Sequence, residues 1–555
     1  MAARGDLLSA VGLGVVLVWG CGRTPIPPEA QQPRAGGSLR LIYQTPPDTL
    51  DPQAMIFLLD AEIAALPFEG LVGHGVRPGE VRPLLAESWE QSEGGRVWTF
   101  TLREAWFHDD PCFPAGTGRR VTAEDVRWTL ERIARPGAEW PNWYLFAGKV
   151  EGLADYHAGR AKTIRGVQVL DERRVRIRLV RPYASFLRIL ATQAAYIAPR
   201  EAEAAYGAEY GRHAVGTGPF RLVRWKAAGE IVLVRHGRYW RRDESGARLP
   251  HLDSVTIQFR PEASEAGLVA AFLKGETQVL AARRDLLEKL AQSEGAARWR
   301  TAGQTASLAF RFLGFSMDNG GPLARHAELR RALALALDRA ALGKTVPAGP
   351  VRLAETLAPP QLLGREGQWY SLDPVQAGRL LDKWRPELEQ RPPVLASNFD
   401  SDDVGLLRRG LGRLGVTAQV RIRPAGYYGY IAKERPDLFR VSFTPSFGDP
   451  EDYYCLFYSR SSPDVNLTGY RNAEFDRVLE SAMTEMDEAR RRELFQRLEQ
   501  ILKDDVPALY LSHGTPLEVA TAPQLRGVVV RQYFPDFAAA WLAGSEAVHE
   551  NRPAR

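Results

Sequence analysis

The most constraining stretch of the chain places an amphipathic segment between two short apolar ones. Residues 394–396 predict a strand, 404–414 a helix and 416–422 a second strand. Two strands joined through a helix form a βαβ unit, in which the strands run parallel. Such units place helices on the faces of a sheet and leave ligands to bind beyond the strand ends. The sequence therefore predicts an α/β or mixed fold.

Other segments show the same mixture of periodicities. Apolar and polar residues alternate with a period of two in further predicted strands, at 97–102, 174–180, 231–234 and 254–259. Thr122 can cap a helix that begins at Ala123 and ends before Pro136. The chain has 555 residues, of which 45% are apolar and 25% charged. This length exceeds what one hydrophobic core needs, so we expect two or three domains.

The first residues predict an export signal. Residues 7–19 are apolar or small, a length that suits a signal-peptide core and is too short for a stable membrane anchor. A small residue then precedes Cys21, as in the bacterial lipobox, where cleavage exposes a lipid-modified cysteine. We expect residues 1–20 to be a lipoprotein-type signal peptide and Cys21 to be the lipidation site. Trp19 departs from the lipobox pattern, so plain export and an uncleaved helix remain alternatives.

A proline-rich tether follows the lipidation site. Residues 21–36 cannot bury a core and are expected to run partly as polyproline II. The expected location is the periplasmic or outer face of a bacterial membrane, held there by membrane lipid at the N-terminus. The 72 basic and 67 acidic side chains leave a net charge of +5 and are spread along the chain. This distribution argues against a nucleic-acid partner.

Catalytic and metal-binding motifs are absent from the sequence. None of the nine histidines stands at HxxxH or HxH spacing, and no GxSxG or Walker motif occurs. The turn 107–113 gathers a histidine, two aspartates and a cysteine, but one turn offers no tetrahedral ligand set. We therefore expect no cofactor, no metal and no enzyme activity. Spacing cannot find dispersed carboxylates, so a secreted hydrolase remains an alternative.

Two cysteines remain after the predicted lipidation site. Cys112 and Cys455 lie more than three hundred residues apart, in a chain expected to reach an oxidising compartment. We favour two buried thiols, with a disulfide between them as the alternative.

Several short motifs occur together in a fixed order. They are Leu85–Trp89, Trp98–Arg103, Val121–Val126, Gly216–Phe220, Arg238–Trp240, Leu329–Ala332 with Ala336–Arg339, and Gly469–Asn472. This ordered set resembles the family 5 extracellular solute-binding proteins, the oligopeptide- and dipeptide-binding components of ABC importers. The loop 109–120 is longer here than in the usual family pattern.

The resemblance implies an architecture and a role. It implies a two-lobed, periplasmic-binding-protein-like fold of type II, cluster C, with an extra subdomain on the first lobe. On this chain lobe I takes 37–60, 165–260 and 508–555, the subdomain 61–164, and lobe II 261–507. A monomer of this kind captures a small solute between its lobes and delivers it to an ABC permease complex in the membrane.

The resemblance also implies where the solute is held. Peptide-binding relatives hold the ligand ammonium with an aspartate shortly before a motif similar to Gly448–Tyr453, and Ser446 occupies that position here. Asp449 or Asp452 could replace the missing charge. Further candidates for the cleft are Tyr43, Asp48, Asp51, Phe443, Phe447 and Tyr453. The expected solute is a peptide or peptide-like compound, and an oligosaccharide or other non-peptide solute stacked on aromatic rings is the alternative.

Overall fold

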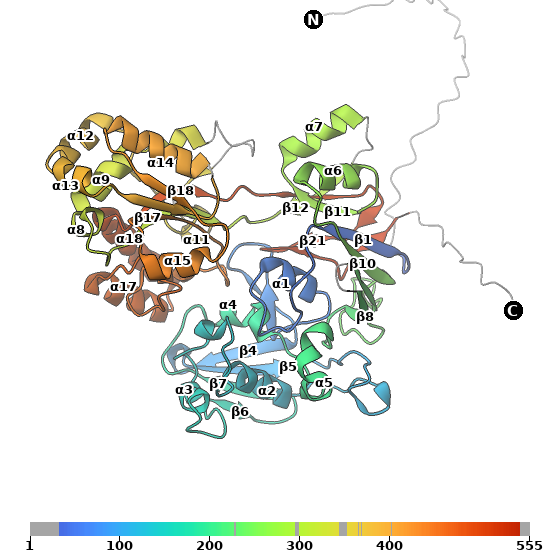
Figure 1. The fold of residues 1–555 in the computed structure, drawn as a ribbon. Coiled ribbons are helices and arrows are strands. Elements are labelled where there is room, and N and C mark those ends of the chain that lie inside the picture. Colours follow the sequence, from blue (N-terminus) through green and yellow to red (C-terminus); the bar gives the residue numbers. More distant parts are fainter. Residues whose placement is uncertain are drawn as a thin grey trace, which may run out of the picture.

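The computed structural model describes residues 33–226, 229–294, 299–342, 352–364, 366–367, 369–400 and 402–543. The predicted signal peptide and Cys21 lie outside these ranges. The described residues form three bodies, which are lobe I, a subdomain and lobe II (Figure 1). Within the described ranges, no helix is both long and apolar enough to cross a bilayer.

Lobe I contains two sheets. The first has the order β1-β10-β9-β8, in which β1 pairs parallel with β10 and the other pairs are antiparallel. Its strands are β1 (Ser38–Tyr43), β10 (Ser254–Phe259), β9 (Glu230–Arg235) and β8 (Phe220–Lys226). The second sheet comprises β11 (Val279–Ala282), β19 (Glu518–Thr521) and β12 (Arg300–Gln304). Helices of this lobe are α1 (Leu58–Ala64), α6 (Glu265–Leu273) and α7 (Arg284–Glu294).

The subdomain is an antiparallel sheet packed against a helix. Its strands are ordered β4-β5-β7-β6 and span Ala86–Ser92, Val97–Leu102, Arg174–Arg178 and Val167–Val169. The helix α2 (Ala123–Ile133) buries Val126, Leu130 and Ile133, the apolar side that its sequence predicts. The Thr122 backbone N–H donates to Asp125 at 2.8 Å, which closes the first turn as expected for a capped helix.

Shorter elements surround these sheets. The short helices are α3 (Leu153–His157), α4 (Phe186–Leu190) and α5 (Arg200–Tyr206). Two-residue and three-residue strands form the pairs β2 (Val72–His74) with β3 (Val81–Pro83), β20 (Leu525–Arg526) with β23 (Trp541–Leu542), and β21 (Val529–Val530) with β22 (Pro535–Asp536).

Lobe II is built on a six-stranded mixed sheet. The order is β14-β18-β13-β17-β15-β16, with bounds Arg352–Leu353, Ala508–His513, Phe310–Phe315, Leu438–Phe443, Val394–Ser397 and Gln419–Ile422. The strands β15 and β16 are parallel and joined through α14 (Asp402–Arg413), so the predicted crossover is confirmed. The larger helices of this lobe are α9 (Ala327–Ala336), α12 (Pro374–Asp382), α15 (Tyr427–Glu434), α17 (Ala473–Thr484) and α18 (Glu488–Asp505). The smaller ones are α8 (Pro322–Arg325), α11 (Pro360–Leu363), α13 (Arg385–Gln390) and α16 (Pro450–Tyr454).

The sheets group some strands differently from the predicted lobe ranges. The strands β6 and β7, expected in lobe I, belong to the subdomain sheet because Val175 and Ile177 of β7 are fully buried beside β5. The following residues 179–190 stay with the subdomain, since Phe186 of α4 packs against Trp98 of β5 (Figure 1). The strands β11 and β12, expected in lobe II, pair with β19 of lobe I. The strand β18, expected in lobe I, pairs with β13 and β14 in lobe II, where all six of its residues are buried. The boundaries at 260/261 and 507/508 therefore do not coincide with the sheet boundaries.

The chain passes from lobe I to lobe II at residues 305–309 and returns at 514–517. These two crossings are hydrogen-bonded to each other, with Thr305 N–H donating to Leu517 O at 3.0 Å and Gly514 N–H to Ala309 O at 2.7 Å. We call the pair the connection. Because it lies between the sheets, bending there breaks no sheet hydrogen bond.

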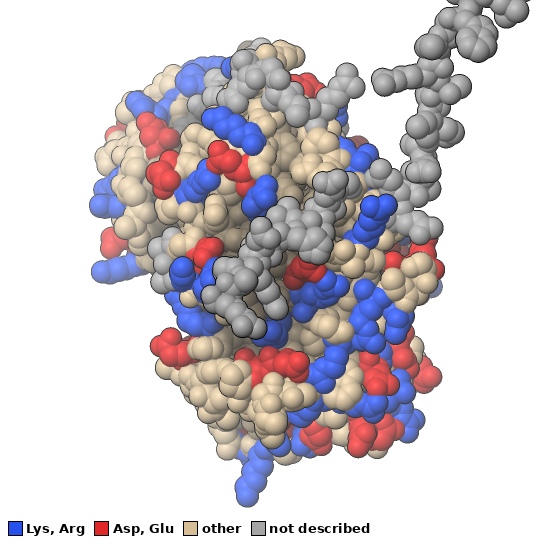
Figure 2. Space-filling view, turned by 90° about the vertical axis from the view of Figure 1, so that its right-hand side faces the viewer, with Lys and Arg blue, Asp and Glu red and all other residues tan. Residues whose placement is uncertain are grey.

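The surface carries both signs of charge. On the face seen in Figure 2, Lys and Arg side chains are intermixed with Asp and Glu side chains and do not form one continuous basic area. This agrees with the even spread of charge along the sequence.

Candidate functional site

The loop that follows β17 lies where the three bodies meet. Between Phe443, which ends β17, and Pro450, which begins α16, the chain turns toward lobe I and the subdomain. The Tyr144 hydroxyl of the subdomain and the Ser446 hydroxyl form a hydrogen bond of 2.8 Å. On the lobe I side, Tyr533 donates its hydroxyl to the Pro445 carbonyl at 2.8 Å. The loop therefore carries Ser446 to the gap between the bodies.

A small cavity lies on the lobe I side of this loop. Its volume is about 100 Å³, and its walls include Ile56, Leu58, His74, Ser446 and Tyr533. Ile56, Phe57 and Leu58 are 68%, 56% and 45% exposed, although they follow one another in the sequence and are all apolar. An exposed apolar run beside a cavity is typical of a ligand-contacting surface. The sequence reasoning missed this run because an apolar stretch ahead of a helix is usually core.

A larger cavity lies on the other side of the loop, between the subdomain and lobe II. Its volume is about 410 Å³. The subdomain side contributes Trp143, Tyr144, Lys149, Arg181 and Tyr183, and lobe II contributes Phe447, Glu451, Asp452, Tyr458 and Arg460. Aromatic rings and charged groups therefore line the same space, as is usual for a site that orients a small polar solute.

Asp452 shapes the loop that separates the two cavities. Its Oδ2 accepts hydrogen bonds from the backbone N–H groups of Ser446 and Phe447, the second at 3.4 Å. Burial raises the pKa of Asp452 to about 7, although these two amides lower it. The loop conformation and the charge of this carboxyl group are therefore linked.

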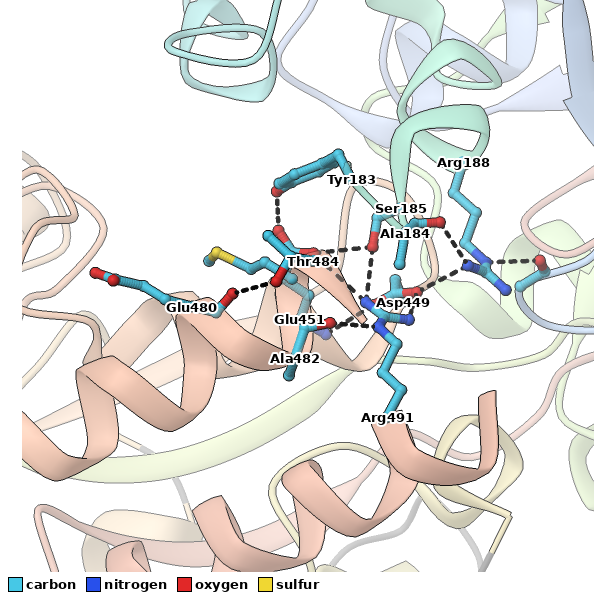
Figure 3. Close-up of polar contacts among 12 residues, drawn as sticks. Tyr183, Ala184, Ser185, Arg188, Asp449, Glu451, Glu480, Ala482, Thr484 and Arg491 are labelled. Atoms are coloured by element: carbon cyan, nitrogen blue, oxygen red, sulfur yellow. Dashed lines mark hydrogen bonds and ion pairs between the residues drawn. The ribbon is translucent and has the colours of Figure 1, made fainter. Parts of the chain in front are cut away.

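A buried polar cluster joins the subdomain to lobe II beside the larger cavity (Figure 3). We call it the closure contact, and it consists of Tyr183, Ser185 and Arg188 on one side and Asp449, Glu451 and Arg491 on the other. The Ser185 hydroxyl donates to Glu451 at 2.9 Å, and Arg491 Nη2 donates to Ser185 Oγ at 2.9 Å. Tyr183 also donates to Glu451.

Two arginines determine the charge of Asp449. The Arg491 guanidinium binds both of its carboxylate oxygens, at 2.7 and 2.8 Å, and Arg188 lies 3.1 Å away. Burial by itself raises the pKa of Asp449, but the two guanidiniums lower it to about 2. Asp449 Oδ1 also accepts the Glu451 N–H at 2.9 Å, which caps α16. This carboxylate is fully engaged within the protein.

The structure brings together some of the predicted site residues and separates others. Ser446 lines the small cavity, and Phe447 and Asp452 line the large one. Tyr453 is buried, donates its hydroxyl to the Leu308 carbonyl at 2.5 Å, and packs edge-on against Phe443. These two rings support the loop from within lobe II.

The predicted residues at the start of lobe I line neither of the two cavities. Tyr43 donates its hydroxyl to Glu62 at 2.8 Å, and burial raises the pKa of Glu62 to about 7. Asp51 forms a bidentate pair with Arg132, with both N–O distances at 2.7 Å. Asp48 is exposed. The charge of Asp51 is therefore satisfied by Arg132 of the subdomain helix α2.

The remaining cysteine and histidine candidates have structural surroundings. Cys112 and Cys455 are free thiols, and burial raises both of their pKa values. His108 is buried, and its Nε2 lies 2.9 Å from the Gly218 carbonyl. Across the ranges the structure describes, no three His, Cys, Asp or Glu side chains are grouped so as to hold a metal ion.

The two lobes, the connection between them and the cavities at their junction define the class of a two-lobed solute-binding protein. The family of bacterial extracellular solute-binding proteins, family 5 Middle, matches residues 80–464. The chain belongs to this family, and the resemblance stated from its motifs is confirmed. It is a substrate-binding protein and not an enzyme.

Curated relatives cover most of the chain. The dipeptide-binding protein of Escherichia coli (strain K12) is 26% identical over 87% of this chain and 90% of its own length. The glutathione-binding protein GsiB of Escherichia coli O157:H7 is 27% identical over 83% of this chain and 85% of its own length. The oligopeptide-binding protein OppA of Bacillus subtilis (strain 168) is 24% identical over 89% of this chain and 90% of its own length.

Solved structures share the fold. The periplasmic binding protein DppA from Helicobacter pylori, in complex with the peptide STSA, has a TM-score of 0.73 and 19% identity over 92% of this chain and 98% of its own. The unliganded open form of MppA, a periplasmic murein tripeptide binding protein, has a TM-score of 0.69 and 22% identity over 91% of this chain and 97% of its own. The predicted type II fold class is confirmed.

Proposed function

We propose that the protein is the extracytoplasmic substrate-binding lipoprotein of an ABC importer. It captures a peptide or peptide-like solute in the cleft between its lobes and delivers it to a membrane permease. The observation that carries this proposal is the position of the loop around Ser446, which reaches from lobe II to the junction of all three bodies with a cavity on each side. Relatives named for dipeptides, oligopeptides and glutathione support the solute class.

Capture follows from the connection and the closure contact. Lobe II moves about residues 305–309 and 514–517. We call the arrangement in which the closure contact is formed the joined arrangement, and a solute favours it to the extent that it binds it better. A micromolar affinity corresponds to about 8 kcal/mol, which a few charge-assisted hydrogen bonds and apolar contacts can supply. The permease then receives loaded protein when it recognises the joined arrangement.

Asp452 is the carboxylate in this site that binds a peptide ammonium. Ser446 carries no charge, and Asp449 is held by Arg491 and Arg188. Asp452 lines the larger cavity, and burial, together with the nearby charges of Glu451 and Asp449, raises its pKa to about 7. A bound ammonium stabilises the ionised form and lowers this pKa.

The N-terminal segment supports the envelope location. In this proposal residues 1–20 are removed, Cys21 carries the lipid, and residues 21–36 hold a monomeric body away from the membrane. The mass of the N-terminal peptide recovered from the membrane fraction tests the lipidation. An unmodified or uncleaved N-terminus contradicts it.

A solute screen tests the function. The melting temperature of the folded protein is measured with dipeptides, tripeptides and oligosaccharides, and we expect peptides to raise it. In solution scattering, we expect the protein with bound peptide to be a smaller particle than the free protein. N-acetylated peptides and the Asp452→Asn variant should both lose about tenfold in affinity, since each removes one partner of the ammonium contact. Stabilisation by oligosaccharides alone favours the non-peptide alternative. Failure of every class to bind overturns the proposal.

A further inference from the structure

The charged groups that line the larger cavity differ in the hydrogen-bond and ion-pair partners that they have within the protein. Glu451 accepts from Tyr183, Ser185 and Arg491, and Asp452 accepts from two backbone amides. Arg460 pairs with Glu480 at 2.9 Å. Both carboxylates and one of the three cations therefore have partners inside the protein.

The other two cations of the cavity wall are Lys149 and Arg181. Lys149 Nζ donates to the Tyr144 carbonyl at 3.3 Å and lies 4.9 Å from the centre of the Tyr183 ring. Arg181 Nη2 lies 4.0 Å from the Met483 sulfur. Among the residues that the structure describes, neither cation has a carboxylate oxygen within 4.0 Å.

Lys149 and Arg181 also act on each other. Burial lowers the pKa of Lys149, the charges of Glu451 and Asp452 raise it, and the positive charge of Arg181 lowers it by a smaller amount. The ammonium is half-buried with a carbonyl and a ring as its contacts, so its charge is incompletely compensated. An anion between the two cations would relieve both the desolvation and the repulsion.

We propose that Lys149, assisted by Arg181, binds a carboxylate group of the solute. This inference rests on the proposed function and names the solute class more narrowly, as a small peptide-like acid. The acidic end lies in the 410 Å³ cavity against Lys149, with Arg181 at its exposed side. The ammonium end lies near Asp452, which lines the same cavity.

The cavity size fits this arrangement. A volume of 410 Å³ lies within the usual range for small-molecule sites, which is roughly 300–1,000 Å³. A carboxylate bound by this half-buried ammonium forms a charge-assisted hydrogen bond, about twice as strong as a neutral one. The site should therefore discriminate a free acid from its amide.

Paired peptides test the inference. A panel of dipeptides and tripeptides is measured by calorimetry, each as the free acid and as the C-terminal amide, with a third set of amides that carry one glutamate side chain. We expect the wild-type protein to bind the free acids at least tenfold more tightly than the plain amides. In the Lys149→Gln variant this ratio should fall to near one, and Arg181→Gln should reduce it by a smaller factor. Lys162→Gln, which changes an exposed lysine of the same subdomain, should leave the ratio unchanged.

The outcomes separate this inference from the function on which it rests. Equal binding of acids and amides by the wild type overturns the carboxylate contact and leaves peptide capture standing. An equal loss of acids and amides in Lys149→Gln also overturns it, because the lysine would then act through packing alone. Binding of the glutamate-bearing amides that is lost in Lys149→Gln supports the contact and identifies a side chain as the source of the carboxylate. No binding of any peptide overturns both proposals.

Discussion

Two of the places where lobe II meets the rest of the molecule differ in kind. At the connection, residues 305–309 and 514–517 are held together by backbone hydrogen bonds and by the continuity of the chain. At the closure contact, Tyr183 and Ser185 meet Glu451 and Arg491 through side chains. In the capture movement proposed above, the first is kept, whereas the second forms when the two surfaces are joined. The comparison identifies which contact a solute can control.

The closure contact suits a reversible joint because its charges are buried yet balanced. Removing two ions from water costs several kcal/mol for each ion, and a well-formed pair regains about that amount. Arg491 and Arg188 face Asp449 and Glu451 within one cluster. The contact is therefore specific in geometry without a large net gain, so a solute of modest affinity can decide whether it forms.

Removing Arg491 should have the largest effect. The Arg491→Met variant leaves Asp449 and Glu451 buried with Arg188 as the nearest remaining guanidinium, and loss of one partner from a buried ion cluster costs about 3–5 kcal/mol. Urea unfolding followed by circular dichroism measures this loss.

The neighbouring arginine on α18 is a matched control. Arg492 is 53% exposed in its side chain and pairs with Glu488 on the surface. Arg492→Met should change the free energy of unfolding by about 0.5 kcal/mol or less. Similar losses of unfolding free energy in the two variants would show that the closure contact stabilises the protein no more than a surface ion pair does.

The next largest effect should come from the side of the closure contact that belongs to the subdomain. The double variant Tyr183→Phe, Ser185→Ala removes two hydrogen-bond donors from Glu451, at roughly 1–3 kcal/mol for each buried group left unsatisfied. Because the joined arrangement alone needs these bonds, we expect a larger particle by solution scattering and weaker peptide binding. Tyr428→Phe, at a tyrosine that is 52% exposed, should change neither measurement.

Predictions from the sequence were accurate where local pattern decides structure. The strands β5 and β7, the helix α2 and the crossover through α14 follow from periodicity and from one capping residue. The position of β18 did not follow, because its place between β13 and β14 depends on partners about 200 and about 160 residues away. Sequence motifs located the family but not the sheet to which each strand belongs.

The candidate site was partly predictable for the same reason. Ser446 and Phe447 lie in one loop and Asp452 lies in the helix α16 that directly follows it, so the motif that found one of them found all three. Asp449 resembled a free carboxylate in the sequence, since its partner Arg491 stands 42 residues later. Lys149 and Arg181 belong to no sequence motif. That neither of them has a carboxylate partner is seen only in the structure, where the subdomain and lobe II together form the cavity.

The free energy of unfolding should change by about 1 kcal/mol with pH through Asp452, which holds the loop around Ser446. The connection contains no such titrating carboxyl group. Burial raises the pKa of Asp452 to about 7, so the folded state holds this proton more tightly than the unfolded chain does. The stabilisation is present at low pH and is lost as the pH rises through 7, by roughly 1 kcal/mol between about pH 6 and about pH 8.

Asp452→Asn should remove this component of the pH dependence. Asp60 and Glu62, whose burial raises their pKa values to about 6 and about 7, titrate in both proteins and cancel in the comparison. Chemical unfolding of both proteins across this pH range measures the difference. Identical slopes in the wild type and the variant would rule out Asp452 as the titrating group.

The smallest effect concerns the connection itself. A Cβ atom added at Gly514 would lie 2.2 Å from Ser307 Oγ, so Gly514→Ala forces that hydroxyl out of its rotamer at about 0.5–1.5 kcal/mol. Ser307→Gly removes the obstructing atom and also relieves a backbone φ of 27°, so the double variant should recover the wild-type stability. Peptide affinity should change little in all three variants, because the connection keeps its backbone hydrogen bonds whether the lobes are joined or apart. A loss of affinity as large as that of the Tyr183 and Ser185 variant would mean that the connection, and not the closure contact, sets the balance between the two arrangements.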